Sequence, residues 1–174
     1  ALMMDPSADP FAAPAPDADA PIERFGAKDA NDLSWANLLN AYTCTECGRC
    51  TSECPANLTG KKLSPRKIMM DTRDRIEEIG QNIATNGSFL DDGKSLLGDY
   101  ITNEELWACT SCNACVQACP VDIDPLNIIM KLRNFATMEE SSAPGALNAM
   151  MTNVENNGAP WPFNQMDRAN WINE

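Results

Sequence analysis

The sequence predicts an all-α protein made of two similar units, each consisting of a helix, a cysteine loop and a second helix. Apolar residues recur at helical intervals through most of the chain, and no segment shows the alternation typical of a strand. Helix-capping residues stand at several points along the sequence. Two cysteine runs, residues 44–55 and 109–120, have the same spacing and therefore indicate an internal repeat.

The first 32 residues differ in composition from the rest of the chain. The stretch DPSADPFAAPAPDADAP (5–21) consists mostly of proline, alanine and aspartate. Such a segment has little apolar surface to bury, and its prolines interrupt any helix. We therefore interpret residues 1–32 as an extended tether, which is either a free tail or a strap lying on a partner.

A first helix is predicted over residues 33–42, LSWANLLNAY. Its larger apolar residues recur at intervals of three and four and define one face of a helix that leads into Cys44. These residues are Trp35, Leu38, Leu39 and Tyr42.

Later helices are predicted from their first residues. A serine, threonine or aspartate stands where a helix cap is expected, followed by proline or by the glutamate of a capping box. The three predicted starts are Ser64–Pro65, Thr102 with Glu105, and Asp124–Pro125. A last helix is predicted over 143–156, with Gly158 ending it.

The repeat relates CTECGRCTSECP in the first half to CTSCNACVQACP in the second. Each run ends in proline, and a capped helix begins soon after it. We expect the two units to form one domain over residues 33–140. Residues 141–174 then make a C-terminal helix and an extension rich in tryptophan and proline.

The spacing C-x₂-C-x₂-C-x₃-C-P is that of an iron–sulfur run, in which the fourth cysteine binds the cluster of the other run. A short loop can present three sulfurs to one cluster, while the fourth lies where the chain is already leaving it. The sequence therefore predicts two [4Fe–4S] clusters. The first is assigned to Cys44, Cys47, Cys50 and Cys119; the second is assigned to Cys109, Cys112, Cys115 and Cys54.

Three other uses of eight cysteines fit this pattern less well. Structural zinc needs sets of four, so a third cysteine at the next x₂ step is surplus. Disulfide scaffolds are usually small and poor in core residues, and this chain has several amphipathic helices. A thioredoxin-like dithiol needs only one C-x-x-C. The chain has no histidine, which excludes histidine-ligated metal sites and histidine acid–base catalysis.

Charge and hydropathy exclude further classes of partner. The formal net charge is −12 and the pI is near 4.3, which argues against binding to nucleic acid or to anionic lipid. No apolar run is long enough to span a bilayer, so we expect no direct insertion into a membrane by this segment.

Basic residues are concentrated in KKLSPRKIMMDTRDR (61–75). This stretch has three interpretations: a solvated helix face, a docking patch for an acidic partner, or a counter-charge to a nearby cluster. Arg49 lies within the first cysteine run, where the second has Ala114. A cation there favours the more negative, reduced state, so we predict the higher potential for the cluster at Cys44.

These motifs resemble the α-helical ferredoxin domain, in which two such runs are separated by a long helical insert. That domain is found in an iron–sulfur subunit of heterodisulfide reductase and in the iron–sulfur subunits of anaerobic glycerol-3-phosphate dehydrogenase, lactate-utilisation complexes and succinate dehydrogenase. The resemblance covers roughly residues 33–138. The stretch NVENNGAPWPFNQMDRANW (153–171) is similar to the segment after this domain in heterodisulfide-reductase-like Fe–S oxidoreductases.

The resemblance implies an electron-transfer module that is not catalytic on its own and relays single electrons between redox partners of a larger complex. Implied partners are a flavoprotein, a cysteine-rich domain, or a quinone-linked or cytochrome-like membrane protein. Two alternatives stay open: the ferredoxin portion of a longer catalytic Fe–S oxidoreductase, and a zinc-stapled interaction module. Such clusters indicate a reducing compartment, hence the cytoplasm or the cytoplasmic face of a membrane complex.

Overall fold

The computed structural model of the chain describes residues 24–173, and the predicted all-α class is confirmed there. In this part of the chain the only β feature is an isolated bridge between Leu97 and Ile101. The helices are η1 (Ala30–Asp32), α1 (Trp35–Thr43), α2 (Arg49–Ser52), α3 (Pro55–Leu58), α4 (Pro65–Asn86), η2 (Leu96–Tyr100), α5 (Asn103–Ala108), α6 (Ala114–Gln117), α7 (Pro125–Met138), α8 (Gly145–Asn157) and η3 (Gln165–Asn173). Most of the predicted tether lies outside the described residues.

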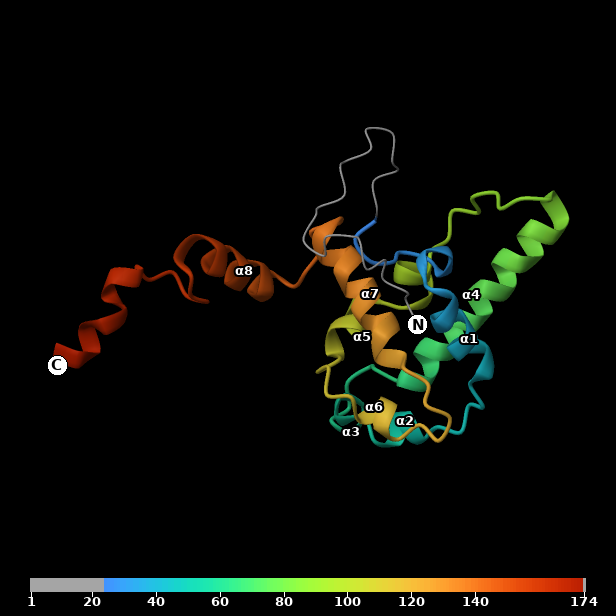
Figure 1. The fold of residues 1–174 in the computed structure, drawn as a ribbon, viewed down its shortest axis with the longest axis horizontal. Helices are drawn as coiled ribbons and strands as arrows, with labels where there is room; N and C mark the ends of the chain where they lie inside the picture. The colour runs from blue at the N-terminus through green and yellow to red at the C-terminus, as the bar shows by residue number, and fades with distance from the viewer. Residues whose placement is uncertain (1–23, 174) are drawn as a thin grey trace, which may run out of the picture.

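Two long helices, α4 and α7, form the centre of the body, with α1 against α4 and α5 against α7 (Figure 1). The core between them is aliphatic and includes Ile68, Met69, Ile128, Ile129 and Leu132. The short helices α2, α3 and α6 gather at one end of the body, where the two cysteine runs lie (Figure 1). The packing of α4 on α7 therefore holds the two cysteine loops side by side.

The predicted helix starts are confirmed by their hydrogen bonds. The Ser64 hydroxyl accepts from the amide of Lys67 at 3.3 Å, and the Asp124 carboxylate accepts from the amide of Asn127 at 2.9 Å. Thr102 and Glu105 form the full capping box. These caps satisfy amides that the helices themselves leave without partners, so each helix begins at a residue set by local sequence.

The first helix forms as predicted, but most of the apolar face that the sequence identified is not buried. Trp35, Leu39 and Tyr42 are exposed, and Asn37 and Ala41 are buried. The small Ala41 allows α1 to approach the body closely, and the amide of Asn37 donates to the side-chain oxygen of Asn127 on α7 at 3.4 Å. Close approach of backbones therefore decided which face of α1 is covered.

The segment before α1 packs on the body through small residues. Ala27, Ala30 and Leu33 are buried, and the amide of Ala27 donates to the carbonyl of Lys131 on α7 at 3.0 Å. Gly26 has φ of +93°, and a Cβ there would lie 2.3 Å from the Lys131 carbonyl oxygen. Only glycine fits this contact, which ties the segment to α7.

A buried arginine joins this segment to α4 and to the loop after α4. Arg75 has no exposed surface and donates to the Asp29 carboxylate through Nε and Nη2, at 2.9 and 2.7 Å. Its Nη1 donates to Asp92 at 2.6 Å, and its Nη2 also donates to the carbonyl of Lys94 at 2.9 Å. The guanidinium charge is thus balanced by two carboxylates, as a buried cation requires.

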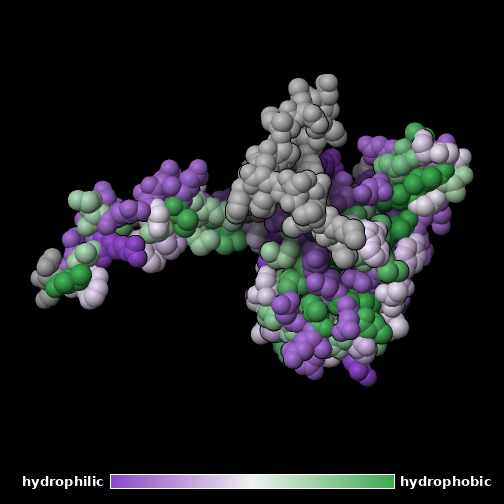
Figure 2. All heavy atoms as spheres, in the orientation of Figure 1, coloured by the Kyte–Doolittle hydropathy of each residue, from purple (hydrophilic) through white to green (hydrophobic). Residues whose placement is uncertain are grey.

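The C-terminal part, α8 and η3, extends away from the body (Figure 1). Helix α8 has no buried residue and ends at Gly158, as predicted. Trp161, Phe163 and Trp171 are all exposed, and Figure 2 shows hydrophobic side chains on the surface of this extension.

No helix within residues 24–173 is long and apolar enough to cross a membrane. The domain limits at 32 and 140 stay predictions.

Candidate metal centre

The two cysteine loops have the same backbone conformation. In the first, Glu46 and Gly48 have φ of 55° and 80°; in the second, the equivalent Ser111 and Asn113 have φ of 56° and 63°. Gly48 and Asn113 each precede a short helix, α2 and α6 respectively. The left-handed residues turn the chain sharply between cysteines, which directs successive sulfurs toward one centre.

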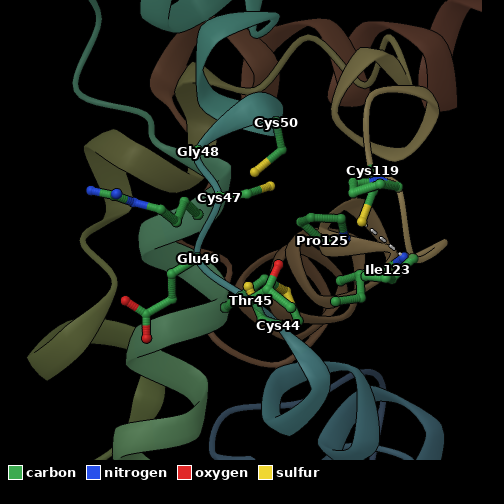
Figure 3. A pocket seen from close by; sticks show the side chains of 13 residues that line it. Cys44, Thr45, Glu46, Cys47, Gly48, Cys50, Cys119, Ile123 and Pro125 are labelled. Carbon is green, nitrogen blue, oxygen red and sulfur yellow. Dashed lines mark hydrogen bonds between the residues drawn. The ribbon is translucent and has the colours of Figure 1, made fainter.

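The first cavity is lined by cysteines from both runs. Its lining includes the first three cysteines of the first run and Cys119 of the second. Figure 3 shows the sulfurs of Cys44, Cys47, Cys50 and Cys119 facing this common space. These are the four residues that the sequence predicted as one ligand set.

The second cavity repeats this arrangement with the runs exchanged. It is lined by Cys109, Cys112, Cys115 and Cys54. Cys54 and Cys115 are buried, whereas Cys112 and the equivalent Cys47 of the first loop are exposed. Each cavity therefore has a buried side toward the core and an open side at the protein surface.

Apolar side chains close the inner wall of each cavity. Met69, Ile123 and Pro125 line the first, and Leu63, Leu126 and Ile129 line the second. Both sets come from α4, α7 and the segments that lead into them. An apolar wall of this kind lowers the local dielectric constant. Nearby charges therefore act more strongly on a cluster that the sulfurs bind.

Backbone amides donate to cysteine sulfurs in this site. The amide of Ile123 donates to Cys119 Sγ at 3.3 Å, drawn as a dashed line in Figure 3. The amide of Ser111 donates to Cys109 Sγ at 3.4 Å. Hydrogen bonds to ligand sulfurs are one of the means by which a protein sets the potential of an iron–sulfur cluster.

Burial and neighbouring groups shift the pKa values of three of the thiols. Desolvation by burial raises the pKa of Cys115 to about 11, with the neighbouring Cys109 contributing, and burial also raises the pKa of Cys50. The pKa of Cys112 is lowered, chiefly by the backbone amide of Ala114. Metal binding overrides these shifts because it requires thiolates and releases their protons.

The donor set suits iron–sulfur clusters better than zinc or disulfides. A tetrahedral zinc site takes four ligands, and the third cysteine of each C-x₂-C-x₂-C spacing is surplus to paired zinc knuckles. Two sets of four sulfurs around separate cavities fit two clusters that each take four thiolates.

Most basic residues of the 61–75 stretch are paired with carboxylates. Lys62 pairs with Glu104 at 2.7 Å, and Lys67 pairs with Asp71 and Glu105 at 2.7 and 2.9 Å. Within the described residues, Lys61 and Arg66 form no ion pair. Both are exposed, and Arg66 lines the first cavity.

Arg133 is a residue near the second cavity that the sequence did not single out. From α7 its guanidinium donates to the carbonyls of Leu106 and Cys109 at 2.8 and 2.5 Å, and it lies 5.0 Å from the centre of the Trp107 ring. Burial lowers the pKa of Arg133, but a guanidinium stays charged at neutral pH. Arg133 follows Pro125, the first residue of α7, at the same interval at which Arg73 follows Pro65, the first residue of α4. This equivalence in the repeat could have identified Arg133 from the sequence.

Comparison with known proteins agrees with this site. Residues 43–123 match the model of the 4Fe-4S dicluster domain. The chain is 34% identical over 90% of its length to a "Probable iron-sulfur-binding oxidoreductase FadF" from Bacillus subtilis, covering 26% of that protein. It is 31% identical over 87% of its length to an "EtfAB:quinone oxidoreductase" from Syntrophomonas wolfei, covering 24% of it.

A third relative is shorter. The chain is 31% identical over 63% of its length to one polypeptide of the ferredoxin- and F(420)H(2)-dependent CoB-CoM heterodisulfide reductase of Methanosarcina acetivorans, covering 54% of it. The chain thus spans about a quarter of the first two relatives and about half of the third. The region of the family match contains all eight cysteines of both cavities. Residues 43–123 therefore carry a 4Fe-4S dicluster domain, and the chain binds two [4Fe–4S] clusters.

Proposed function

We propose that this chain is an electron-transfer module of a larger oxidoreductase. In this proposal Cys44, Cys47, Cys50 and Cys119 hold one cluster, and Cys109, Cys112, Cys115 and Cys54 hold the other. The observation that carries it is the lining of each cavity by three cysteines of one run and the fourth of the other. A [4Fe–4S] cluster accepts and releases single electrons, and two of them provide successive stations.

The protein's own part is to position and insulate the two sites. Helices α2 and α6 pack on each other, so the two cysteine loops share a boundary. Exchange of the fourth cysteine gives each site a ligand from the opposite loop, which makes the two sites parts of one structure. The apolar inner walls exclude water, and the open sides at Cys47 and Cys112 are where electrons enter and leave in this proposal.

The relatives suggest the class of partner. Two of them are named as oxidoreductases, one for EtfAB and quinone, and the third is part of a heterodisulfide reductase. We infer that this chain passes electrons between a flavoprotein and a quinone-linked, cytochrome-like or cysteine-rich partner. We place it in the reducing interior of the cell, at the cytoplasmic face when its complex is membrane-bound.

A docking face follows from the charges at the first site. Arg49 lies in the first loop, Arg66 lines the first cavity, and Lys61 precedes α4. All three are exposed, with no ion pair in the part of the chain that the structure describes. The chain as a whole carries −12. Exposed cations on an otherwise acidic protein attract an acidic partner to one place, which favours docking over the first cluster.

Metal analysis under anaerobic conditions tests the proposal. Protein purified without oxygen should contain roughly eight iron and eight acid-labile sulfide per chain and should take up two electrons in a reductive titration. About two zinc per chain without sulfide would instead support a zinc-stapled module. A preparation that is iron-free and still fully folded would overturn the proposal.

A second candidate is that these residues are the ferredoxin portion of a longer catalytic Fe–S oxidoreductase. The observation that favours it is the length of the first two relatives, about four times the span that matches. The mass of the native polypeptide, measured by intact-protein mass spectrometry, separates the two candidates. A native mass close to 19.0 kDa would contradict the longer chain.

A further inference from the structure

We propose that a matched pair of arginines, Arg73 and Arg133, makes the two cluster sites electrically different. Each arginine reaches from the helix behind its own cysteine loop to the same position of that loop. In the first unit the arginine is neutralised by a carboxylate, and in the second its charge stands next to a ligand cysteine without one. The inference rests on the ligand sets of the proposed function.

The two arginines are equivalent in the repeat. Arg73 follows Pro65, the first residue of α4, at the interval at which Arg133 follows Pro125, the first residue of α7. Their loop contacts also correspond. Glu46 and Ser111 are each two residues after the first cysteine of a run, and both are left-handed, with φ of 55° and 56°.

In the first unit the contact is an ion pair. Arg73 Nη2 lies 2.5 Å from a carboxylate oxygen of Glu46, and the Arg73 side chain is 22% exposed. Figure 3 shows the Glu46 carboxylate turned away from the four sulfurs of the cavity. The positive and negative charges lie together at the outer side of the loop, so their combined field at the first site is small.

In the second unit every acceptor around the arginine is neutral. Arg133 Nη1 donates to the Ser111 hydroxyl at 3.2 Å, and Nη2 donates to the carbonyls of Leu106 and Cys109 at 2.8 and 2.5 Å. No carboxylate within the described residues pairs with Arg133, and its other neighbour is the face of Trp107. The charge is partly buried, so solvent screens it little.

The expected consequence is a difference in reduction equilibrium. Reduction adds one negative charge at a site that already carries excess negative charge, and a nearby cation stabilises the reduced form. Arg133 therefore favours reduction at the second site, whereas the Arg73–Glu46 pair contributes little at the first. Arg66 also lines the first cavity, and its charge affects the potential of the first cluster. The test of the arginine pair therefore uses the change in each potential on substitution, and not which of the two potentials is higher.

The test exchanges the two loop residues. Ser111→Glu places a carboxylate beside Arg133, as Glu46 does beside Arg73 in the first unit. The left-handed φ at position 111 is compatible with glutamate, because Glu46 has nearly the same φ. Glu46→Ser removes the carboxylate that contacts Arg73 Nη2 and leaves only the more distant Asp74 carboxylate, 3.9 Å from Arg73 Nε. Neither change touches a cysteine or a core residue. Each anaerobically purified variant is analysed for iron and sulfide and then titrated electrochemically, with the reduced clusters followed by EPR.

Ser111→Glu should make reduction of one cluster about tenfold less favourable, a downward shift of about 59 mV for a one-electron couple. Glu46→Ser should raise the potential of the other cluster by a similar amount. Arg133→Lys, which retains the charge, should shift the potential less than Arg133→Met. Matched controls are Ser88→Glu and Glu155→Ser, both at exposed positions away from the cysteine loops.

The inference is overturned when both substitutions move the same step, or when their shifts equal those of the controls. Failure of the proposed function has a different signature, because the unaltered protein would then lack two iron–sulfur reduction steps. A variant with full iron and sulfide content and an unshifted potential contradicts only the role of the arginines. A loss of clusters on Ser111→Glu is checked against Ser111→Gln, which keeps the size without the charge.

Discussion

Cys54 of the first run and Cys109 of the second line the same cavity, although each lies in a different repeat unit. This arrangement makes a specific prediction for double substitutions. In Cys54→Ser with Cys112→Ser, both changes affect one cluster, so about four iron per chain should remain. In Cys54→Ser with Cys47→Ser, both clusters lose a ligand, and the iron content should fall below that level. Equal iron in both double variants would contradict the exchange of ligands.

Replacing the buried Arg75 should lower stability strongly. Arg75→Met leaves the carboxylates of Asp29 and Asp92 without their partner, and breaking a buried ion pair by removing one member costs about 3–5 kcal/mol. Urea unfolding of the anaerobic protein at neutral pH measures the effect. Lys94→Met, which removes an exposed pair with Glu78, is the control and should cost far less.

Gly26 should be intolerant of a side chain. In Gly26→Ala the new Cβ would lie 2.3 Å from the Lys131 carbonyl oxygen and 2.6 Å from the Phe135 amide nitrogen, both backbone atoms. The expected loss is about 3 kcal/mol or more. Gly87→Ala is the matched control, because Gly87 also has positive φ but nothing within 4 Å of its Cβ position. It should lose only about 1–2 kcal/mol, the cost of the left-handed conformation.

Charge reversal at the proposed docking face should slow electron delivery. Lys61→Glu with Arg66→Glu replaces two exposed cations by anions, and the second-order rate of reduction by an acidic redox partner should fall at least about tenfold at low salt. The difference should shrink as ionic strength rises. Lys131→Glu, an exposed change on α7, is the control. A rate independent of both salt and charge would remove the docking face from the proposal.

Removal of iron should loosen the cluster end of the body before its centre. The helices α2, α3 and α6 have only four residues each, too few to be stable without tertiary contacts. Hydrogen exchange after anaerobic chelation should therefore speed up at the amides of Cys54 and Leu58. Amides of α4 and α7 that pack in the aliphatic core should stay protected. Uniform exchange throughout the body would show that the clusters hold the whole fold.

Local sequence was sufficient for the helix starts and for the kind of cofactor. Ser64, Thr102 and Asp124 cap the helices that they were predicted to cap, because a cap depends on residues within one turn. Local sequence did not determine which face of α1 is covered. Periodicity identified the row from Trp35 to Tyr42 as the larger apolar surface. The face that is buried instead contains the small Ala41, which allows the backbone of α1 to lie close to the body.

The pairing of charges was also beyond the sequence. Six basic residues fall within 61–75, where the sequence left three interpretations open, and the structure divides them into paired and unpaired cations. Glu46 and Arg73 lie in different elements, as do Ser111 and Arg133. Such contacts depend on where α4 and α7 place their side chains relative to the loops, which no local pattern encodes.

The sequence alone determined the chemistry of this protein: eight cysteines in two equal runs, without histidine, specify sulfur-bound iron, since spacing and donor type are local properties of the chain. Tertiary structure decided how the two sites differ. Packing of α4 and α7 set which arginine meets a carboxylate and which meets only neutral oxygens, because a charge acts through distances in space rather than along the chain.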